Sequence, residues 1–433
     1  MAQEARVAVV GGGVAGLAAA AFAARAGARV TLFERMSEAG GRARTRVDEG
    51  FAFNMGPHAL YLEGPAITAL RELGIEPAGA SPPTSGGLAW QGGRLHALPG
   101  GTVSLLTTGL LGVSEKLELA AIMTRMSKLA ERAATGESVD EFLAREVQSE
   151  RVRELLRALV RLTSYSSMTG AISAAPAFAQ IVTGLGPGVR YVDGGWGALV
   201  LGLERAAEKA GVELRRGVRV ERVTHDGTAR GVELAGGERF AADAVILAGG
   251  PEEASALVDD GAHPFLAQAL ERALPVRAAC LDLGLSSLPN PKRLFAIGID
   301  RPLYYSVHSA AAKLAPEGQA TVCIARYLGA GERPSREELE TDFHGLLDAL
   351  QPGWRERVVT RTLLRDVVVA HDLPQAARGG LGGRTPGPVS GIAKLYLAGD
   401  WIGPDGMLAD ASFASARAAA RAAAGARGVR VAA

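Results

Sequence analysis

The 433-residue sequence contains few of the residues that define several common protein classes. It has two cysteines, Cys280 and Cys323, which are too few for a disulfide-built scaffold or a cysteine zinc site. We interpret them as separate buried thiols and predict no metal site. The net charge is only +1, so the composition does not indicate nucleic acid as a partner. Hydrophobic residues make up 48% and charged residues 21%, as in a folded globular protein of two or three domains.

Long apolar runs are also missing. The first residues show no signal-peptide pattern, which predicts a cytoplasmic location. Two stretches lack charged residues, 97–114 and 162–189, but both contain glycine, proline and hydroxyl residues. Neither therefore predicts a membrane-spanning helix. We favour buried segments that line a cavity, and the alternative is a peripheral contact with a membrane surface.

Glycine, in contrast, is abundant, with 56 residues, and its first cluster carries the strongest pattern. Residues 6–10 predict a buried strand, 17–26 an alanine-rich helix and 28–33 a second strand. Between the first strand and the helix, three residues fit the pattern G-x-G-x-x-G: Gly11, Gly13 and Gly16. The first glycine permits a tight turn, the second lets the backbone approach a pyrophosphate, and the third lets the helix pack on the strand.

The residues around these glycines complete a predicted dinucleotide site. Val14 and Ala15 open the helix, whose free N–H groups and positive dipole end attract phosphates. Glu34 ends the second strand, at the distance where an acidic residue accepts hydrogen bonds from a ribose diol. Because the glycines lie between a strand and a helix, we prefer dinucleotide binding to a merely glycine-rich loop.

The chain continues with features that a plain NAD dehydrogenase does not need. Glu34 is followed by a second group of candidate diphosphate contacts: Arg35, Gly40, Gly41 and Arg42. The pattern Glu34-x5-Gly40-Gly41-Arg42 resembles the FAD-binding start of the amine oxidase and phytoene desaturase superfamily. That superfamily includes flavin amine oxidases, protoporphyrinogen oxidases and carotenoid desaturases. The resemblance implies that FAD is the cofactor and that a later segment also runs close to it: Gly56, Pro57 and His58.

The end of the sequence resembles the closing flavin motif of the same superfamily. Residues 394–398 predict a strand, Gly399 and Asp400 follow it, and a helix extends to about residue 424. By resemblance, Asp400 would bind the ribityl or diphosphate part of FAD. The backbone near Met407 and Leu408 would lie at the N1–C2=O edge of the flavin, where a helix dipole stabilises the reduced anion. Neither cysteine lies in a flavin motif, so we expect the FAD to be bound non-covalently.

A third block implies a domain built from non-contiguous segments. Residues 191–199 contain a glycine turn before a helix, and 218–223 predict a strand whose backbone near Val220 would meet the adenine. We predict an α/β fold with a Rossmann-type, glutathione-reductase-like FAD-binding domain and an α+β substrate domain. The predicted FAD-binding domain comprises 1–79, 189–255 and 385–433. The predicted substrate domain comprises 80–188 and 256–384.

Candidate catalytic residues are few, because hydride transfer to a flavin needs mainly orientation and exclusion of water. His58 is the best placed by resemblance. Tyr304 and His308 share one face of a predicted strand, and that face could line the substrate pocket. We disfavour a pair between His371 and Asp372, since adjacent strand residues point apart.

The leading hypothesis is an FAD-dependent oxidoreductase that resembles phytoene desaturases and protoporphyrinogen oxidases. It would take a hydride from an apolar C–C or C–N bond of a small apolar or amphipathic substrate to flavin N5. The first alternative is a flavin amine oxidase. Such enzymes commonly carry a lysine at N5, and here only Lys292 and Lys313 are candidates, by region alone. The second alternative is a non-redox relative that binds prenyl groups and proteins or isomerises a sugar. The oligomeric state and the electron acceptor are not encoded in any motif.

Overall fold

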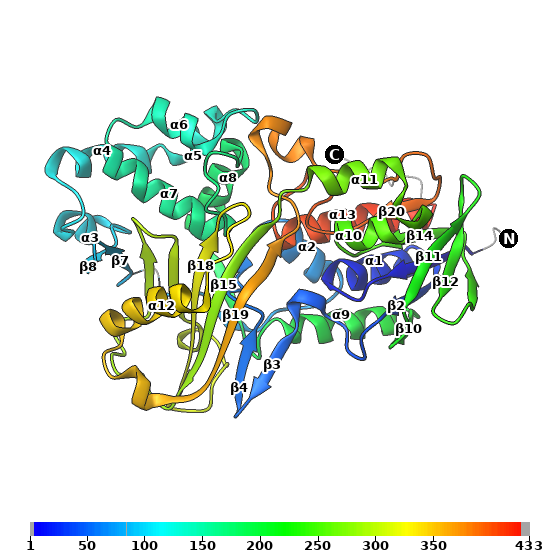
Figure 1. Cartoon of the computed structure of the whole chain (residues 1–433), viewed down its shortest axis with the longest axis horizontal. Coiled ribbons are helices and arrows are strands. Elements are labelled where there is room, and N and C mark those ends of the chain that lie inside the picture. The colour runs from blue at the N-terminus through cyan, green and yellow to red at the C-terminus, as the bar shows by residue number, and fades with distance from the viewer. Residues whose placement is uncertain (1–3, 84, 426–433) are drawn as a thin grey trace.

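The computed structural model describes residues 4–83 and 85–425 and contains two large sheets that follow one another along the long axis (Figure 1). The first is a parallel sheet of five strands in the order β10-β2-β1-β14-β20. Its strands are short and apolar because both faces are covered. Their bounds are β1 (Arg6–Val10), β2 (Arg29–Glu34), β10 (Glu213–Arg216), β14 (Ala244–Leu247) and β20 (Leu395–Leu397).

Helices and a smaller sheet cover this parallel sheet. The core on one face is formed with α1 (Val14–Arg25), α2 (Pro65–Glu72), α9 (Gly197–Lys209) and α13 (Ala409–Ala423). The core on the other face is formed with β11 (Val220–His225), β12 (Ala229–Leu234), β13 (Arg239–Ala241), α10 (Pro251–Ala256) and α11 (Pro264–Arg272). This is the layered arrangement of a Rossmann-type domain, and the expected fold class is confirmed.

The second sheet has seven strands in the order β19-β15-β18-β17-β16-β7-β8, and only β16 and β7 run parallel. The strands are β7 (Leu88–Gln91), β8 (Arg94–Ala97), β15 (Val276–Leu285), β16 (Phe295–Gly298), β17 (Leu303–Val307), β18 (Ala320–Leu328) and β19 (Val358–Ala370). The helical core on one face includes α3 (Thr102–Thr107), α4 (Val113–Thr124), α5 (Met126–Arg132), α6 (Val139–Glu146), α7 (Glu150–Ser164) and α8 (Ala174–Leu185). The other face packs on α12 (Arg336–Leu350).

Short strands lie where the chain passes between the two parts. They are β3 (Thr45–Asp48), β4 (Phe51–Asn54), β5 (Leu60–Tyr61), β6 (Gly79–Ala80) and β9 (Val189–Val192). Because β9 pairs with both β5 and β6, it joins the segments on either side of the helical block. Each large sheet is assembled from segments far apart in the sequence, and the domain boundaries given above remain a prediction.

One sequence-based expectation about buried segments is wrong. Residues 97–114 do not line the large cavity, and Val103, Leu106 and Val113 are exposed to solvent. The segment forms α3 and the start of α4, and its buried residues are Thr108, Leu110 and Leu111. The stretch 162–189 is largely buried, and its Tyr165 does line the cavity.

Candidate active site

The turn after β1 shows why glycine is required there. Gly11 has a φ of +106°, and its N–H donates to the Phe33 carbonyl at 2.8 Å. A Cβ on Gly16 would lie 1.8 Å from the Gly11 carbonyl oxygen, so only glycine allows α1 to approach the turn so closely. A Cβ on Gly13 would meet no atom within 4 Å, because Gly13 borders open cavity. The turn therefore presents backbone to a ligand at the N-terminus of α1.

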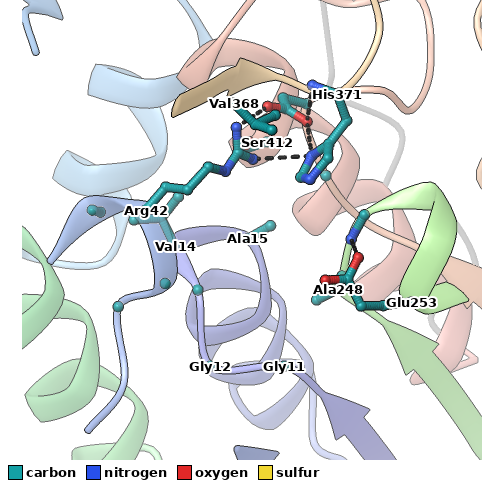
Figure 2. Close-up of a pocket in the computed structure, with 18 of the residues that line it drawn as sticks. Gly11, Gly12, Val14, Ala15, Arg42, Ala248, Glu253, Val368, His371 and Ser412 are labelled. Carbon is teal, nitrogen blue, oxygen red and sulfur yellow. Dashed lines mark hydrogen bonds and ion pairs between the residues drawn. The ribbon is translucent and has the colours of Figure 1, made fainter. Parts of the chain in front are cut away.

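The cavity at this turn has a volume of about 1030 Å³ and extends from the parallel sheet to β15 and β19 of the seven-stranded sheet. Figure 2 shows Gly11, Gly12, Val14 and Ala15 on one side of it, with Ala248 and Glu253 beside them. The predicted cofactor residues that line the cavity are Gly11, Gly13, Val14, Ala15, Glu34, Arg35, Gly40, Gly41, Arg42, Pro57, His58, Val220, Gly399, Asp400, Met407 and Leu408. Gly16 and Gly56 lie behind the wall, where they allow close packing.

Glu34 occupies the position expected of a ribose acceptor. It is buried at the end of β2, and its two carboxylate oxygens accept hydrogen bonds from the backbone N–H of Gly12 at 2.7 Å and of Met36 at 2.8 Å. Each oxygen can accept a second hydrogen bond. The carboxylate therefore orders the glycine turn and still has capacity for a ribose hydroxyl.

A charge cluster around the buried Asp400 stands above the N-terminus of α1, where Arg42 reaches across the cavity toward His371 (Figure 2). The Arg42 guanidinium donates to Asp400 Oδ2 at 2.8 Å and to the Val369 carbonyl at 2.8 Å. His371 Nδ1 lies 2.9 Å from Asp400 Oδ1. Burial alone would raise the pKa of Asp400, but Arg42 and His371 hold it below its usual range. Asp400 is therefore ionised, and it positions two cationic or polar groups at the cavity wall.

His58 lines the cavity as a neutral ring. Its Nδ1 lies 3.0 Å from the Gly56 carbonyl and donates to it, and the ring packs edge-on against Trp196 at 5.0 Å. Burial lowers the pKa of His58. The ring is placed where the sequence predicted, and its catalytic role remains a prediction.

Tyr304 and His308 do not reach the cavity, which contradicts the expectation that their strand face lines it. Tyr304 Oη lies 3.0 Å from His308 Nε2, and Tyr191 Oη contacts both Tyr304 and Ser306. These polar atoms satisfy one another in the core behind the wall. Burial, with a smaller effect of His58, lowers the pKa of His308 to about 3. The cluster is structural, because its hydrogen-bonding atoms are already paired.

The seven-stranded sheet and its helices contribute a mainly apolar wall to the cavity. It consists of Tyr165, Cys280, Val367, Val368, Val369 and His371. His371 is the only titratable nitrogen among them, and it is engaged by Asp400 and Arg42. Burial raises the pKa of the Cys280 thiol well above its ordinary value, so this cysteine is protonated.

At the same cavity, the chain enters α13 through a strained residue. Leu408 has a φ of +54°, which a leucine adopts only when the surrounding structure holds it there. Asp410, in the first turn of α13, accepts the backbone N–H of Ala66 on Oδ1 at 2.8 Å. Its Oδ2 has no protein partner among the described residues, and Asp410 lines the cavity. Burial raises the pKa of Asp410 to about 6.

Two of these site residues were missed at the level of sequence. His371 was weighed only against its neighbour Asp372, whereas its partner Asp400 comes from the strand end 29 residues later. Asp410 follows the recognised Met407 and Leu408, but no motif marks it. Its significance comes from the distant N-terminus of α2, which it caps.

Comparisons with known proteins agree with this geometry. The family described as flavin containing amine oxidoreductase matches residues 14–424. A 4,4'-diapolycopen-4-al dehydrogenase of Metabacillus indicus is 24% identical over 82% of this chain and 82% of its own. A zeta-carotene-forming phytoene desaturase of Myxococcus xanthus is 28% identical over 56% of this chain and 53% of its own. The structure of cyclohexylamine oxidase from Brevibacterium oxydans aligns with a TM-score of 0.73 and 18% identity, covering 98% of this chain and 99% of that one.

The chain therefore belongs to the family of flavin containing amine oxidoreductases. The resemblance proposed from the glycine motifs is confirmed, and so are an oxidoreductase activity and FAD as the cofactor. The non-redox alternative is not retained. The cavity fits this cofactor, because it joins the open Gly13 backbone, Glu34 and the start of α13 in one continuous space.

Proposed function

We propose that this protein dehydrogenates a long apolar substrate of the carotenoid kind, with FAD as the hydride acceptor. The observation that carries the proposal is the wall of Tyr165, Cys280 and residues 367–369, which offers apolar contacts and no free charge to a substrate. Such a wall binds hydrocarbon through area removed from water. The names of the two relatives given above point to the same substrate class.

The positions of the lysines argue against the amine oxidase alternative. Lys292 and Lys313 are exposed, and no lysine is found among the described residues that line the cavity. The lysine that flavin amine oxidases commonly place beside N5 is therefore not supplied by either candidate. A protoporphyrinogen oxidase-like reaction on a C–N substrate would also need an apolar wall. A porphyrinogen is therefore included among the compounds of the assay below.

The residues of this chain have separable tasks in the proposed reaction. Bound FAD supplies the acceptor for the hydride that leaves the substrate carbon with its electron pair. Tyr165 and the β19 valines hold the apolar chain and exclude water. The proton lost from the adjacent carbon needs a base, and Asp410 Oδ2 is a positioned carboxylate oxygen with no protein partner among the described residues. The substrate thereby loses one hydride and one proton and gains one double bond.

An anaerobic reduction assay tests the substrate class. The purified holoprotein is mixed without oxygen with an acyclic polyene hydrocarbon in detergent, an apocarotenoid aldehyde, a porphyrinogen or cyclohexylamine. We expect the yellow flavin absorbance to fade with the polyene or the aldehyde and to persist with cyclohexylamine. Rapid bleaching by the amine alone would contradict the proposal, and bleaching by the porphyrinogen alone would move it to a C–N substrate.

A pair of valine variants on β19 tests the wall itself. Val367→Thr introduces a hydroxyl at the cavity, while Val359→Thr makes the same change at an exposed position of the same strand. We expect the first to weaken binding of the apolar substrate several-fold, because a buried hydroxyl loses hydration, and to leave FAD content unchanged. Equal substrate affinities in the two variants would show that the valine wall does not hold the substrate.

A further inference from the structure

The end of the substrate domain carries an unusual concentration of exposed aliphatic side chains. We define the α3–α4 face by four of them: Val103, exposed to 75%, Leu106 to 69%, Val113 to 79% and Leu117 to 68%. Nine large hydrophobic side chains are exposed among the described residues, and these four fall within positions 103–117. A cluster of this kind marks an interaction surface more often than scattered exposed residues do.

The outward direction of these side chains is set by the helices themselves. In α3, Leu105 packs against the helical core while Val103 and Leu106, three residues apart, face solvent. In α4, Leu119 is buried while Val113 and Leu117, four residues apart, are exposed. The core is complete without the four outward side chains. Folding of this domain therefore gives no reason for their hydrophobicity.

A hydrogen bond holds the two helices together at this face. The Lys116 ammonium donates to the Leu106 carbonyl at 2.8 Å, so the first turn of α4 is fixed to the end of α3. The stretch 97–114 contains no charged residue. Val103, Leu106 and Val113 lie in this uncharged stretch, and Leu117 lies one helical turn after Val113 in α4.

Three cations of α4, α5 and the residue that joins these helices have no acidic partner in the described part of the chain. Lys116, Arg125 and Lys128 form no ion pair with an acidic residue among the described residues. The two acids of α4 accept backbone N–H groups: Glu115 accepts the Gly112 N–H at 2.6 Å, and Glu118 accepts the Gln148 N–H at 2.6 Å. Exposed aliphatic residues edged by free cations are the combination that binds an anionic lipid interface.

We infer that the α3–α4 face docks on the surface of a lipid bilayer that contains anionic lipids. Figure 1 shows α3 and α4 at the opposite end of the molecule from β11 and β12. None of the helices in the described part of the chain combines the length and apolar character needed to cross a bilayer. The inference rests on this surface alone and does not depend on the proposed reaction.

Vesicle flotation of the holoprotein tests the inference. One vesicle preparation contains phosphatidylcholine alone, and the other contains phosphatidylcholine and phosphatidylglycerol in equal parts. We expect the protein to float with the anionic vesicles and the double variant Leu106→Ser/Leu117→Ser to lose about tenfold or more of this binding, because two leucines no longer enter the interface. Added salt should weaken binding of the unchanged protein, since its cations meet lipid phosphates.

A matched control separates this face from general hydrophobicity. Leu185→Ser/Leu201→Ser removes two leucines exposed to 55% and 53% elsewhere on the surface. We expect this control to float like the unchanged protein. Thermal melting and flavin content of both variants report folding. Equal flotation of the two double variants, or no flotation of the unchanged protein, would overturn the inference. Self-association that only Leu106→Ser/Leu117→Ser abolishes, without vesicle binding, would assign the face to a second copy of the chain and also overturn it.

Discussion

Glu34 links the order of the glycine turn to cofactor binding. Its carboxylate holds the Gly12 and Met36 N–H groups, so Glu34→Ala removes both supports and the ribose acceptor at once. We expect FAD binding to weaken by about 1–3 kcal/mol, the cost of leaving buried polar groups unpaired. Turnover per bound flavin should change little, because the predicted contact of Glu34 is with the ribose and not with the flavin ring or the substrate.

Titration with FAD measures this loss. Glu76→Ala, which removes an exposed carboxylate after α2, serves as the control and should bind FAD like the unchanged protein. An unchanged FAD affinity in Glu34→Ala would show that the residue orders the turn without contacting the cofactor.

Asp410 makes stability depend on pH. Burial is the largest cause that raises the folded pKa of Asp410 above the ordinary range of an aspartate, to about 6. A carboxyl whose pKa is raised on folding makes its full contribution to the free energy of unfolding at a pH below its pKa in the unfolded chain. This contribution is lost as the pH rises through the pKa in the folded protein. The unliganded protein should therefore lose on the order of 2 kcal/mol from this group between about pH 4 and pH 7.

Asp410→Asn keeps an acceptor for the Ala66 N–H but removes the titration. Urea unfolding at several pH values should give a flatter profile for this variant than for the unchanged protein. Asp405→Asn, at an exposed position in the preceding loop, should leave the profile as it was. The same loss of stability with pH in Asp410→Asn would assign it to another group.

The rate of flavin reduction gives Asp410 a second, independent test. If Asp410 is the base, the rate of flavin reduction should fall below about pH 6, because the carboxyl is then protonated and cannot accept the substrate proton. Asp410→Asn should reduce its flavin about 10²-fold more slowly and without this pH dependence, while FAD content stays near normal. His58→Ala provides the comparison. If it slows reduction more than Asp410→Asn does, the base has been assigned to the wrong residue.

At the scale of elements, the entry to α13 depends on one crowded glycine. Gly406 has a φ of +72°, and a Cβ there would lie 2.6 Å from the Asp410 Cβ. Gly403, with a φ of +75°, would bring its Cβ near no other atom. Alanine at either site carries the backbone cost of a left-handed residue, about 1–2 kcal/mol. Only Gly406→Ala should also displace Asp410 and weaken FAD binding, which titration of the two variants measures. Equal FAD affinities would show that the loop absorbs the extra methyl group.

Local patterns were sufficient to predict the elements that carry the cofactor motifs. The apolar run at 6–10 and the glycines after it encode β1, the turn and α1 within about twenty residues of chain. The apolar spacing of residues 114–132 predicts a single helix, but the structure has two, α4 and α5, which meet at Arg125. A break of this kind depends on how each helix packs on the domain, and neither proline nor glycine marks it.

At the scale of the whole molecule, the cavity is a product of long-range assembly. Arg42 follows β2, His371 follows β19 and Asp400 follows β20, and they meet only because two sheets pack side by side. Sequence resemblance could assign Arg42 and Asp400 to the cofactor one by one. It could not predict that Arg42 and Asp400 bind each other. Nor could it predict that Tyr304 and His308 lie behind the cavity wall, because alternation along a strand shows which side chains share a face but not what that face packs against.

The last prediction concerns how this assembled cavity holds FAD. Cys280 is the only cysteine that lines it in the described part of the chain, and burial raises the pKa of its thiol well above the usual range. A protonated thiol is a poor nucleophile, so we expect no thioether. Acid precipitation should release yellow FAD into the supernatant. Gently prepared apoprotein should rebind FAD and gain thermal stability, by about 2.7 kcal/mol when free FAD is 100-fold above its Kd. Flavin that stays with the precipitate would contradict non-covalent binding. A melting temperature unaffected by FAD would show that FAD does not bind and stabilise the folded apoprotein.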